Sequence, residues 1–261
     1  MSLFDPHPRP LPLQGEGVVR ARPSTIGETA RTVVYAVGIA VLIRTFAFEP
    51  FSVPSESMLP TLEVGDYFFV SKWAYGYSRH SFPFSLAPFS GRLLGAEPAR
   101  GDIVVFKLPS DDATDYVKRL VGVPGDRIQV TGGVLHVNDL PVPRTPVQSP
   151  VYRDGRGNSL LYRETMAVGG AYDTIDRFRS AQDDTEEFLV APGHYFMIGD
   201  NRDNSQDSRF LGQVGQVPAE NLVGRASFVF FSTNGTARFW EVWKWPATIR
   251  YTRLFTWLRP A

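Results

Sequence analysis

The sequence contains no cysteine among its 261 residues. A chain without cysteine forms no disulfide, offers no thiolate to a metal and has no cysteine nucleophile, so several reaction classes are excluded at once. The formal net charge is +0, with 27 basic and 27 acidic residues, and no overall field favours nucleic acid as a partner. These absences narrow the possible functions without choosing among those that are left.

Histidine and lysine are also scarce, with four residues of each type. The histidines are dispersed and lack the paired spacing of metal ligands, so we expect no metal site and no bound cofactor. None of them lies in a motif that would make it a catalytic base. The remaining candidates for a base are the four lysines, which are Lys72, Lys107, Lys118 and Lys244.

Glycine and proline are plentiful, with 23 and 21 residues, which indicates many turns and short strands rather than long helices. Three β-rich runs follow Gly-Asp turns or precede them, at residues 65–75, 100–106 and 116–126. Residues 126–138 predict a β-hairpin, because Gly132 and Gly133 separate two alternating segments. We therefore expect a mainly β protein with an antiparallel, barrel-like sheet.

One long apolar run occupies residues 33–48 and is interrupted only by Arg44 and Thr45. With its flanks, the segment 29–50 reaches the length of a single transmembrane helix. The alternatives are a buried core helix or a removable signal peptide. Several arginines precede the run, so the positive-inside rule predicts that residues 1–28 form a mobile cytoplasmic tail and that the rest of the chain lies outside.

The remaining chain divides by composition. Residues 51–140 and 188–235 predict the β core, and the polar, Gly/Pro-punctuated segment 141–187 predicts an insertion lobe between its strands. The C-terminal tail, 236–261, mixes aromatic with basic residues. That composition is typical of a membrane interface, and packing on the core is the alternative.

The residue on which the chemistry depends is Ser57, which lies between Pro54 and Pro60. Two prolines fix the backbone and remove two donors, so this stretch is neither a helix interior nor a central strand. A rigid loop of this kind can hold a hydroxyl exposed as a nucleophile. The alternative is an ordinary Ser/Pro-rich turn.

A serine hydroxyl needs a base, and Lys118 is the best-placed lysine. In the strand predicted around it, alternation puts Lys118 on one face with Tyr116 and Leu120, while Arg119 faces the other way. If the Lys118 face is covered, burial lowers the pKa of the amine toward neutrality. The alternative is that Lys118 is solvated and Arg119 points inward.

A third polar stretch runs from Ile198 to Arg209. So many hydrogen-bonding side chains are typical of an exposed loop. The alternative is a turn that satisfies its own polar groups, in which Asp207 pairs with Arg209 and Ser205 is aimed at the active site.

These stretches, taken in order, resemble the signature boxes of the bacterial type I signal peptidases. The matching residues are Pro54-Ser-x-Ser57-Met-x-Pro-Thr, Gly65-Asp66, Arg100-Gly-Asp, Tyr116-Val-Lys-Arg-Leu-Val-Gly-x-Pro-Gly-Asp126 and Gly199-Asp-Asn-Arg-Asp-Asn-Ser-x-Asp-Ser-Arg209. The resemblance covers residues 50–230. It implies a membrane-bound serine endopeptidase of the Ser/Lys type that removes signal peptides from exported preproteins.

The resemblance also implies roles for single residues. Ser57 is the nucleophile, Lys118 the general base, and Ser55 binds the oxyanion together with the Ser57 backbone N–H. Ser205 orients Lys118, and the loop is held by the Asp207–Arg209 pair with Asp200. Shallow apolar pockets accept small residues at positions −1 and −3 of the preprotein, and their lining consists of Phe51, Val53, Pro54, Met58, Tyr116 and Val117.

The implied location is the inner membrane, with one transmembrane helix in the lipid bilayer and the catalytic domain on the periplasmic side. The sequence departs from the family at Glu56, where many members have a small residue. Two alternatives stay open: a self-cleaving Ser/Lys regulatory protein, and a non-enzymatic, membrane-anchored β-domain that binds secreted proteins.

Overall fold

The computed structural model describes residues 26–82, 85, 89, 91–147, 152–154, 157–238 and 240–258. Most of the predicted N-terminal tail, residues 1–25, lies outside this set. The chain divides into two compact units, residues 1–39 and 40–261. Helix α1 (Ile26–Phe46) starts in the first unit and ends in the second.

Helix α1 has 21 residues and is, within the described ranges, the one helix long and apolar enough to cross a membrane. At 1.5 Å per residue it is about 31 Å long, which matches the ~30 Å of a bilayer's hydrocarbon core. It ends at Phe46, four residues before the predicted end of the anchor, and strand β1 begins at Phe48. Residues 48–52 pair with β2 instead, and Pro50 disfavours the helical conformation at Glu49.

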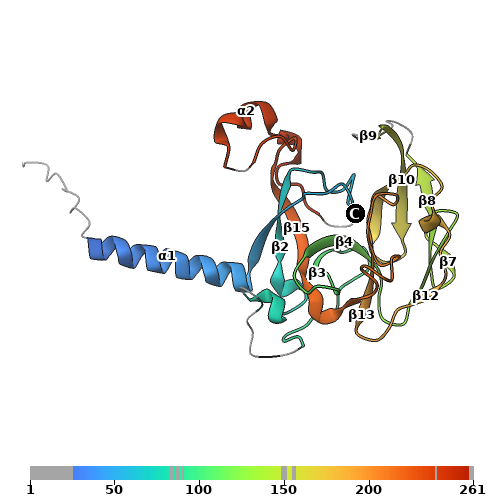
Figure 1. Ribbon diagram of the computed structural model, residues 1–261, viewed down its shortest axis with the longest axis horizontal. Helices are drawn as coiled ribbons and strands as arrows, with labels where there is room; N and C mark the ends of the chain where they lie inside the picture. Colours follow the sequence, from blue (N-terminus) through green and yellow to red (C-terminus); the bar gives the residue numbers. More distant parts are fainter. Residues whose placement is uncertain are drawn as a thin grey trace, which may run out of the picture. The chain divides into compact units, whose positions relative to one another are not determined.

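The largest sheet is antiparallel and curled, and it forms a half-barrel (Figure 1). Its seven strands lie in the order β1-β2-β15-β3-β4-β13-β14. Their bounds are Phe48–Ser52 (β1), Asp66–Ser71 (β2), Leu222–Ser232 (β15), Ile103–Lys107 (β3), Asp115–Gly122 (β4), His194–Ile198 (β13) and Val217–Pro218 (β14). The prediction of a mainly β fold preceded by one apolar helix is confirmed.

Two smaller sheets accompany it in the described part of the chain. One joins β11 (Gly170–Asp176), β10 (Gly157–Met166) and β8 (Arg144–Pro146), with β9 (Tyr152–Asp154) paired to β10. The other joins β12 (Phe188–Leu189), β5 (Arg127–Thr131), β6 (Val134–Val137) and β7 (Leu140–Pro141). The predicted hairpin is β5–β6, and its turn uses Gly132 and Gly133 at φ +55° and +78°, values that favour glycine.

The apolar core consists of clusters of buried side chains packed between the strands and loops. One cluster lies between β2, β3, β15 and the Ser57 loop, and a second cluster lies between β4, β13 and the smaller sheets. In the second cluster, Met166 and Tyr172 of the predicted insertion pack with Ile128 and Phe196 of the predicted core. Part of the insertion is therefore buried against core strands, although the division of the chain into domains stays a prediction.

The C-terminal segment contains short helical turns, including α2 (Trp245–Thr248). Several of its aromatic side chains are exposed, among them Trp243 and Phe255, whereas Trp245 packs 4.8 Å from the Phe231 ring. Both properties proposed from the sequence, interfacial composition and packing on the core, are present in this segment. Its contact with lipid stays a prediction.

Candidate active site

The Ser57 loop joins β1 to β2 and is held in place by its apolar residues. Met58 and Leu62 are fully buried in the first core cluster, and Leu62 N donates to Met58 O at 2.9 Å. The buried side chains of Met58 and Leu62, together with Pro54 and Pro60, leave the backbone at Ser57 little conformational freedom. The Ser57 side chain is itself only 6% exposed.

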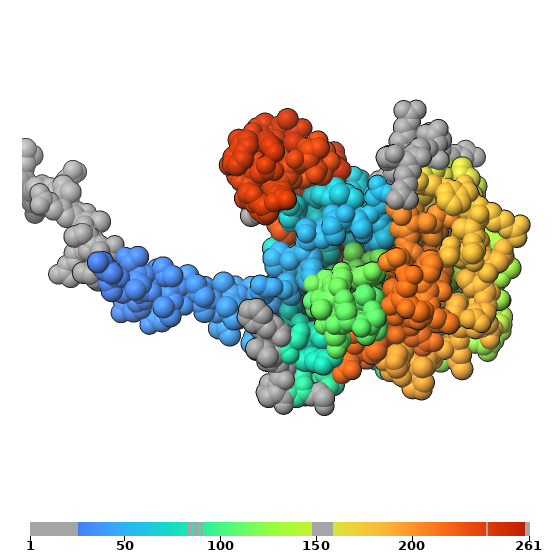
Figure 2. Space-filling model, viewed as in Figure 1, coloured from blue at the N-terminus to red at the C-terminus, as the bar shows by residue number. Residues whose placement is uncertain are grey.

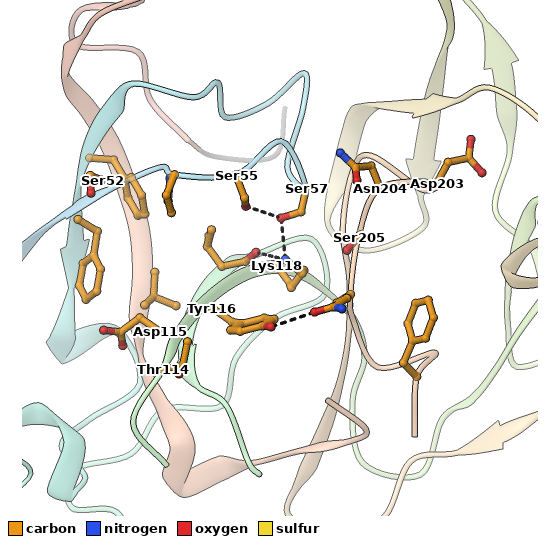
Figure 3. A pocket seen from close by; sticks show the side chains of 17 residues that line it. Ser52, Ser55, Ser57, Thr114, Asp115, Tyr116, Lys118, Asp203, Asn204 and Ser205 are labelled. Carbon is orange, nitrogen blue, oxygen red and sulfur yellow. Dashed lines mark hydrogen bonds between the residues drawn. The ribbon is translucent and has the colours of Figure 1, made fainter. Parts of the chain in front are cut away.

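Strand β4 presents Lys118 to this loop. Lys118 Nζ lies 2.7 Å from Ser57 Oγ and 3.0 Å from Val117 O (Figure 3). Lys118 is 3% exposed and Arg119, on the opposite face of the strand, is 2% exposed. The alternation of the two side chains is as predicted, but neither face is solvated, because packed elements cover the strand on both sides.

Burial sets the protonation of the Lys118 amine. Desolvation lowers its pKa from 10.5 to about 8, against the opposing attraction of Asp207 and Asp200, and with a smaller lowering by Arg209. At pH 7, about a tenth of such amines are neutral and can accept a proton. A lysine in ordinary solvent would offer far fewer, so this environment makes Lys118 a usable base.

Ser55 lies at the same point of the loop. Its Oγ is 3.3 Å from Ser57 Oγ, within hydrogen-bonding distance (Figure 3). A hydroxyl in this place is close to where an oxyanion would form after attack by Ser57.

In the polar stretch from Ile198 to Arg209, some of the polar groups pair with one another, as one of the two interpretations predicted. Asp207 and Arg209 are buried and form an ion pair with a 2.9 Å contact, and Gly199 N donates to Asp207 Oδ2 at 3.0 Å. Desolvation alone would raise the pKa of Asp207, but the Arg209 charge and these hydrogen bonds outweigh it and hold the pKa below its usual value. The exposed-loop alternative does not apply to these residues.

Ser205 lines the same cavity as Lys118 and is 8% exposed. In the described part of the chain, the hydrogen-bond partners of Lys118 Nζ are Ser57 Oγ and Val117 O, and Ser205 is not among them. The role of Ser205 in orienting Lys118 stays a prediction.

Asp200 faces the other side of β4. Its two carboxylate oxygens each lie 2.7 Å from the Arg119 guanidinium, and Thr61 Oγ1 donates to Asp200 Oδ2 at 2.5 Å. The side chain therefore ties three segments together: the 199–209 loop, strand β4 and the end of the Ser57 loop. Such a bidentate pair fixes both position and orientation.

A cavity of about 590 Å³ opens beside Ser57 and Lys118. Three segments far apart in the sequence, coloured blue, green and orange, meet around it on the face shown in Figure 2. Of the six residues predicted to line substrate pockets, four line this cavity, namely Phe51, Pro54, Tyr116 and Val117. Val53 and Met58 are not among its lining residues and are buried in the first core cluster.

Several lining residues were missed by the sequence analysis. Phe68 and Val105 extend the apolar wall, and the opposite wall includes Asn204, Gln206 and Phe210. The period-2 pattern of β2 and β3 could have indicated the first two as one-face residues, but nothing in the sequence indicates that their faces meet at Ser57.

Glu56, the departure from the family pattern, bridges two loops. Asn204 Nδ2 donates to Glu56 Oε2 at 3.0 Å, and Asn201 Nδ2 donates to the Glu56 carbonyl at 3.0 Å. Asn201 N also donates to Ser57 O at 3.1 Å. Ser57 and its neighbour Glu56 are therefore attached directly to the 199–209 loop.

One acidic cluster could in principle hold a cation. Ligand atoms of Asp176, Asp183 and Asp203 lie within 4.8 Å of one another. Some of these carboxylate oxygens already bind protein groups, since Arg144 pairs with Asp176 and Arg177 N donates to Asp203.

A serine hydroxyl bonded to a buried amine of lowered pKa, at the wall of a cavity, is the arrangement of Ser/Lys hydrolases. This example lies in a curled β-sheet that follows an apolar helix, and comparison with known proteins identifies the family. The sequence pattern of the family described as "Signal peptidase, peptidase S26" matches residues 26–231.

Similar proteins carry the same description. The signal peptidase I of Rickettsia canadensis is 38% identical over 88% of this chain and 93% of the relative, and that of Rickettsia akari is 41% identical over 76% of this chain and 77% of the relative. A crystal structure of a signal peptidase I from Enterococcus faecalis is 24% identical, covers 50% of this chain and 97% of its own, and has a TM-score of 0.30. That structural similarity is too low to support any argument.

The chain belongs to the signal peptidase I family, peptidase S26. It is a membrane-anchored serine endopeptidase that cleaves signal peptides from exported proteins. The alternatives of a self-cleaving regulator and of a non-enzymatic binding domain are thereby set aside.

Proposed function

We propose that Ser57 is the nucleophile of this peptidase and that Lys118 is its general base. The 2.7 Å contact between Lys118 Nζ and Ser57 Oγ supports both roles at once. The neutral amine accepts the hydroxyl proton as Ser57 Oγ attacks the carbonyl carbon of the scissile bond. The resulting ammonium then donates a proton to the departing amine.

The oxyanion of the tetrahedral intermediate is bound by Ser55 Oγ and by the backbone N–H of Ser57. The proximity of Ser55 Oγ to Ser57 Oγ, 3.3 Å, supports this assignment. Each such donor typically lowers the barrier by about 3 kcal/mol. Water, deprotonated by the neutral Lys118, then hydrolyses the acyl-enzyme and frees Ser57.

The cavity receives the residues of the signal peptide that precede the cut. Phe51, Pro54 and Val117 give it an apolar wall next to Ser57. Such a wall favours uncharged side chains, and we assign it to the small residues at positions −1 and −3 of the preprotein. Val53 and Met58 support that wall from the core.

The enzyme is placed in the inner membrane with α1 across the bilayer. The arginines before α1 support a cytoplasmic N-terminus, which puts residues after β1 on the periplasmic side. Exported preproteins emerge on that side, so the site meets its substrate where the signal peptide leaves the membrane.

The test compares purified variants on a preprotein with Ala-x-Ala before its cleavage site. We expect wild type and Lys244→Ala to process it, because Lys244 is exposed on the C-terminal segment and pairs with Glu241. Ser57→Ala and Lys118→Ala should lose at least ~10³-fold in kcat, as nucleophile or base removal does elsewhere. Processing by Lys118→Ala at a rate near that of Lys244→Ala would contradict the assignment.

A further inference from the structure

The volume of the substrate cavity does not by itself explain selection of small side chains. At about 590 Å³ the cavity is within the ~300–1,000 Å³ range of sites that hold whole small molecules. A preference for alanine-sized residues beside the cut requires that something limit the part of the cavity nearest to Ser57 and Lys118.

Two walls of this cavity are joined by a hydrogen bond. Tyr116 Oη, on β4, donates to Gln206 Oε1, on the 199–209 loop, at 3.3 Å. This bond is the dashed line drawn from Tyr116 in Figure 3. Both residues line the cavity, so the bond connects its two sides.

The bonded residues occupy a middle position on each wall. On β4, Lys118 lies two residues after Tyr116, and residues two apart share a face of a strand. Thr114, just before the strand begins, also lines the cavity. On the loop, Ser205 precedes Gln206 and Phe210 follows it. The Tyr116–Gln206 bond therefore lies between the end of the cavity that contains Ser57 and Lys118 and the end that contains Thr114 and Phe210.

One of the two partners is held firmly and the other is not. The Tyr116 ring lies 6.0 Å from the Phe106 ring and 5.2 Å from Lys118 Nζ. Gln206 is exposed, and its side chain reaches the tyrosine across the cavity. Gln206 is therefore the part that a substitution can remove without disturbing the buried core.

We propose that Gln206, held by Tyr116, limits the depth of the pocket beside Ser57 and thereby sets the largest substrate side chain accepted next to the scissile bond. This inference rests on the proposed function, because it concerns the same site. It assigns a specificity-determining role to a residue between Ser205 and Asp207, the two flanking positions that the family resemblance singles out.

The experiment measures kcat/KM for preproteins that carry alanine or leucine at position −1, and separately at position −3. Gln206→Ala should raise the leucine-to-alanine ratio at one of these positions at least threefold over wild type. Pockets discriminate such differences by about 10-fold or more, so the change is measurable. Tyr116→Phe should raise the ratio at the same position, because it removes the donor that holds Gln206.

Two further variants make the result specific. Gln206→Glu keeps an acceptor of the same length and should stay within threefold of the wild-type ratio. Gln213→Ala removes an exposed glutamine from the same loop region outside the cavity and should also stay within threefold. A change of less than threefold for Gln206→Ala, or an equal change for Gln206→Glu, overturns the inference.

The two proposals fail differently. If wild type does not cleave the alanine preprotein, the proposed function fails. If wild type cleaves it and Gln206→Ala discriminates as wild type does, only the role of Gln206 fails.

Discussion

At the scale of the single residue, removal from water is what lowers the pKa of Lys118 and suits it to the proposed role of base. Opposing carboxylates at Asp207 and Asp200 would stabilise its ammonium form, yet desolvation is the larger effect. Asp207 is paired with Arg209 and Asp200 with Arg119, so each carboxylate attracts the Lys118 ammonium less strongly. The site thus keeps a lysine partly neutral without a neighbouring cation as the main cause.

The activity should therefore depend on pH through this amine. Only the neutral form accepts the Ser57 proton, so kcat/KM should rise with pH and level off above about pH 9, one unit beyond the pKa of about 8. Below that pKa the expected slope is close to tenfold per pH unit. Initial rates between pH 6 and 10 on one preprotein check this expectation, and a flat profile over that range would exclude Lys118 as the titrating base.

The same amine should lower the stability of the folded protein at neutral pH. Its pKa is about 8 when folded and 10.5 ordinarily, so between these values the unfolded chain binds a proton that the folded chain does not. Stability therefore rises with pH across this window, and below pH 8 the full penalty, on the order of 3 kcal/mol, applies.

Lys118→Met removes this titration while filling the same space. The free energy of unfolding of wild type, relative to the variant, should increase from pH 8 to pH 10.5. Chemical denaturation of both proteins in detergent at several pH values measures the difference. A difference that does not change with pH would contradict the lowered pKa.

At the scale of elements, the site depends on attachments between the Ser57 loop, β4 and the 199–209 loop. Asp200 binds Arg119 and Thr61, and Asn201 and Asn204 bind Glu56. Ser57 and Lys118 belong to different elements, so these attachments keep Ser57 Oγ and Lys118 Nζ 2.7 Å apart.

Removing the buried ion pair between Asp200 and Arg119 should lower the free energy of unfolding substantially. Asp200→Ala leaves the Arg119 guanidinium, on a fully buried side of β4, without its carboxylate, and such losses typically cost about 3–5 kcal/mol of unfolding free energy. Arg163→Ala, which removes an exposed pair with Asp173, should cost less than about 1 kcal/mol. Thermal or chemical unfolding of the two variants tests the contrast; equal losses would mean that the Asp200 pair does not hold the loop.

Much of the element-scale fold was predictable, because alternation and Gly-Gly turns are local signals. They predicted β4 and the β5–β6 hairpin, and the length of the apolar run predicted the N-terminal helix. Pairing was not predictable: β15 lies between β2 and β3, and no local feature of any of the three strands specifies that order. Helix α1 ends at Phe46, and the bounds of the membrane anchor, 29–50, stay a prediction.

For the site, motif resemblance assigned roles to Ser57 and Lys118, and these roles stay proposals. Contacts that depend on chain segments far apart were beyond sequence reasoning. Glu56 and Asn204 are one example, and the bond between Tyr116 and Gln206 is another. Burial of both faces of β4 was not predictable either, since alternation along a strand indicates one covered face and one solvated face.

At the scale of the whole molecule, the absence of cysteine offers a direct test of orientation. Ser2→Cys and Gln213→Cys, made separately, each introduce one thiol into a chain that has none. In spheroplasts, a membrane-impermeant maleimide should label residue 213 at once and residue 2 only after lysis, because the N-terminus is expected in the cytoplasm. Labelling in the reverse order would contradict the proposed topology.

Lys118 and Arg119 are adjacent on β4 and face opposite sides. If β4 slipped by one residue against its neighbours, the two sides would be exchanged, and a guanidinium would take the place of the amine. Arginine does not give up its proton at physiological pH, so the protein would be intact in outline and inert as a catalyst. By holding Arg119 on its own side, Asp200 keeps beside Ser57 the side chain of the two that can lose its charge, Lys118.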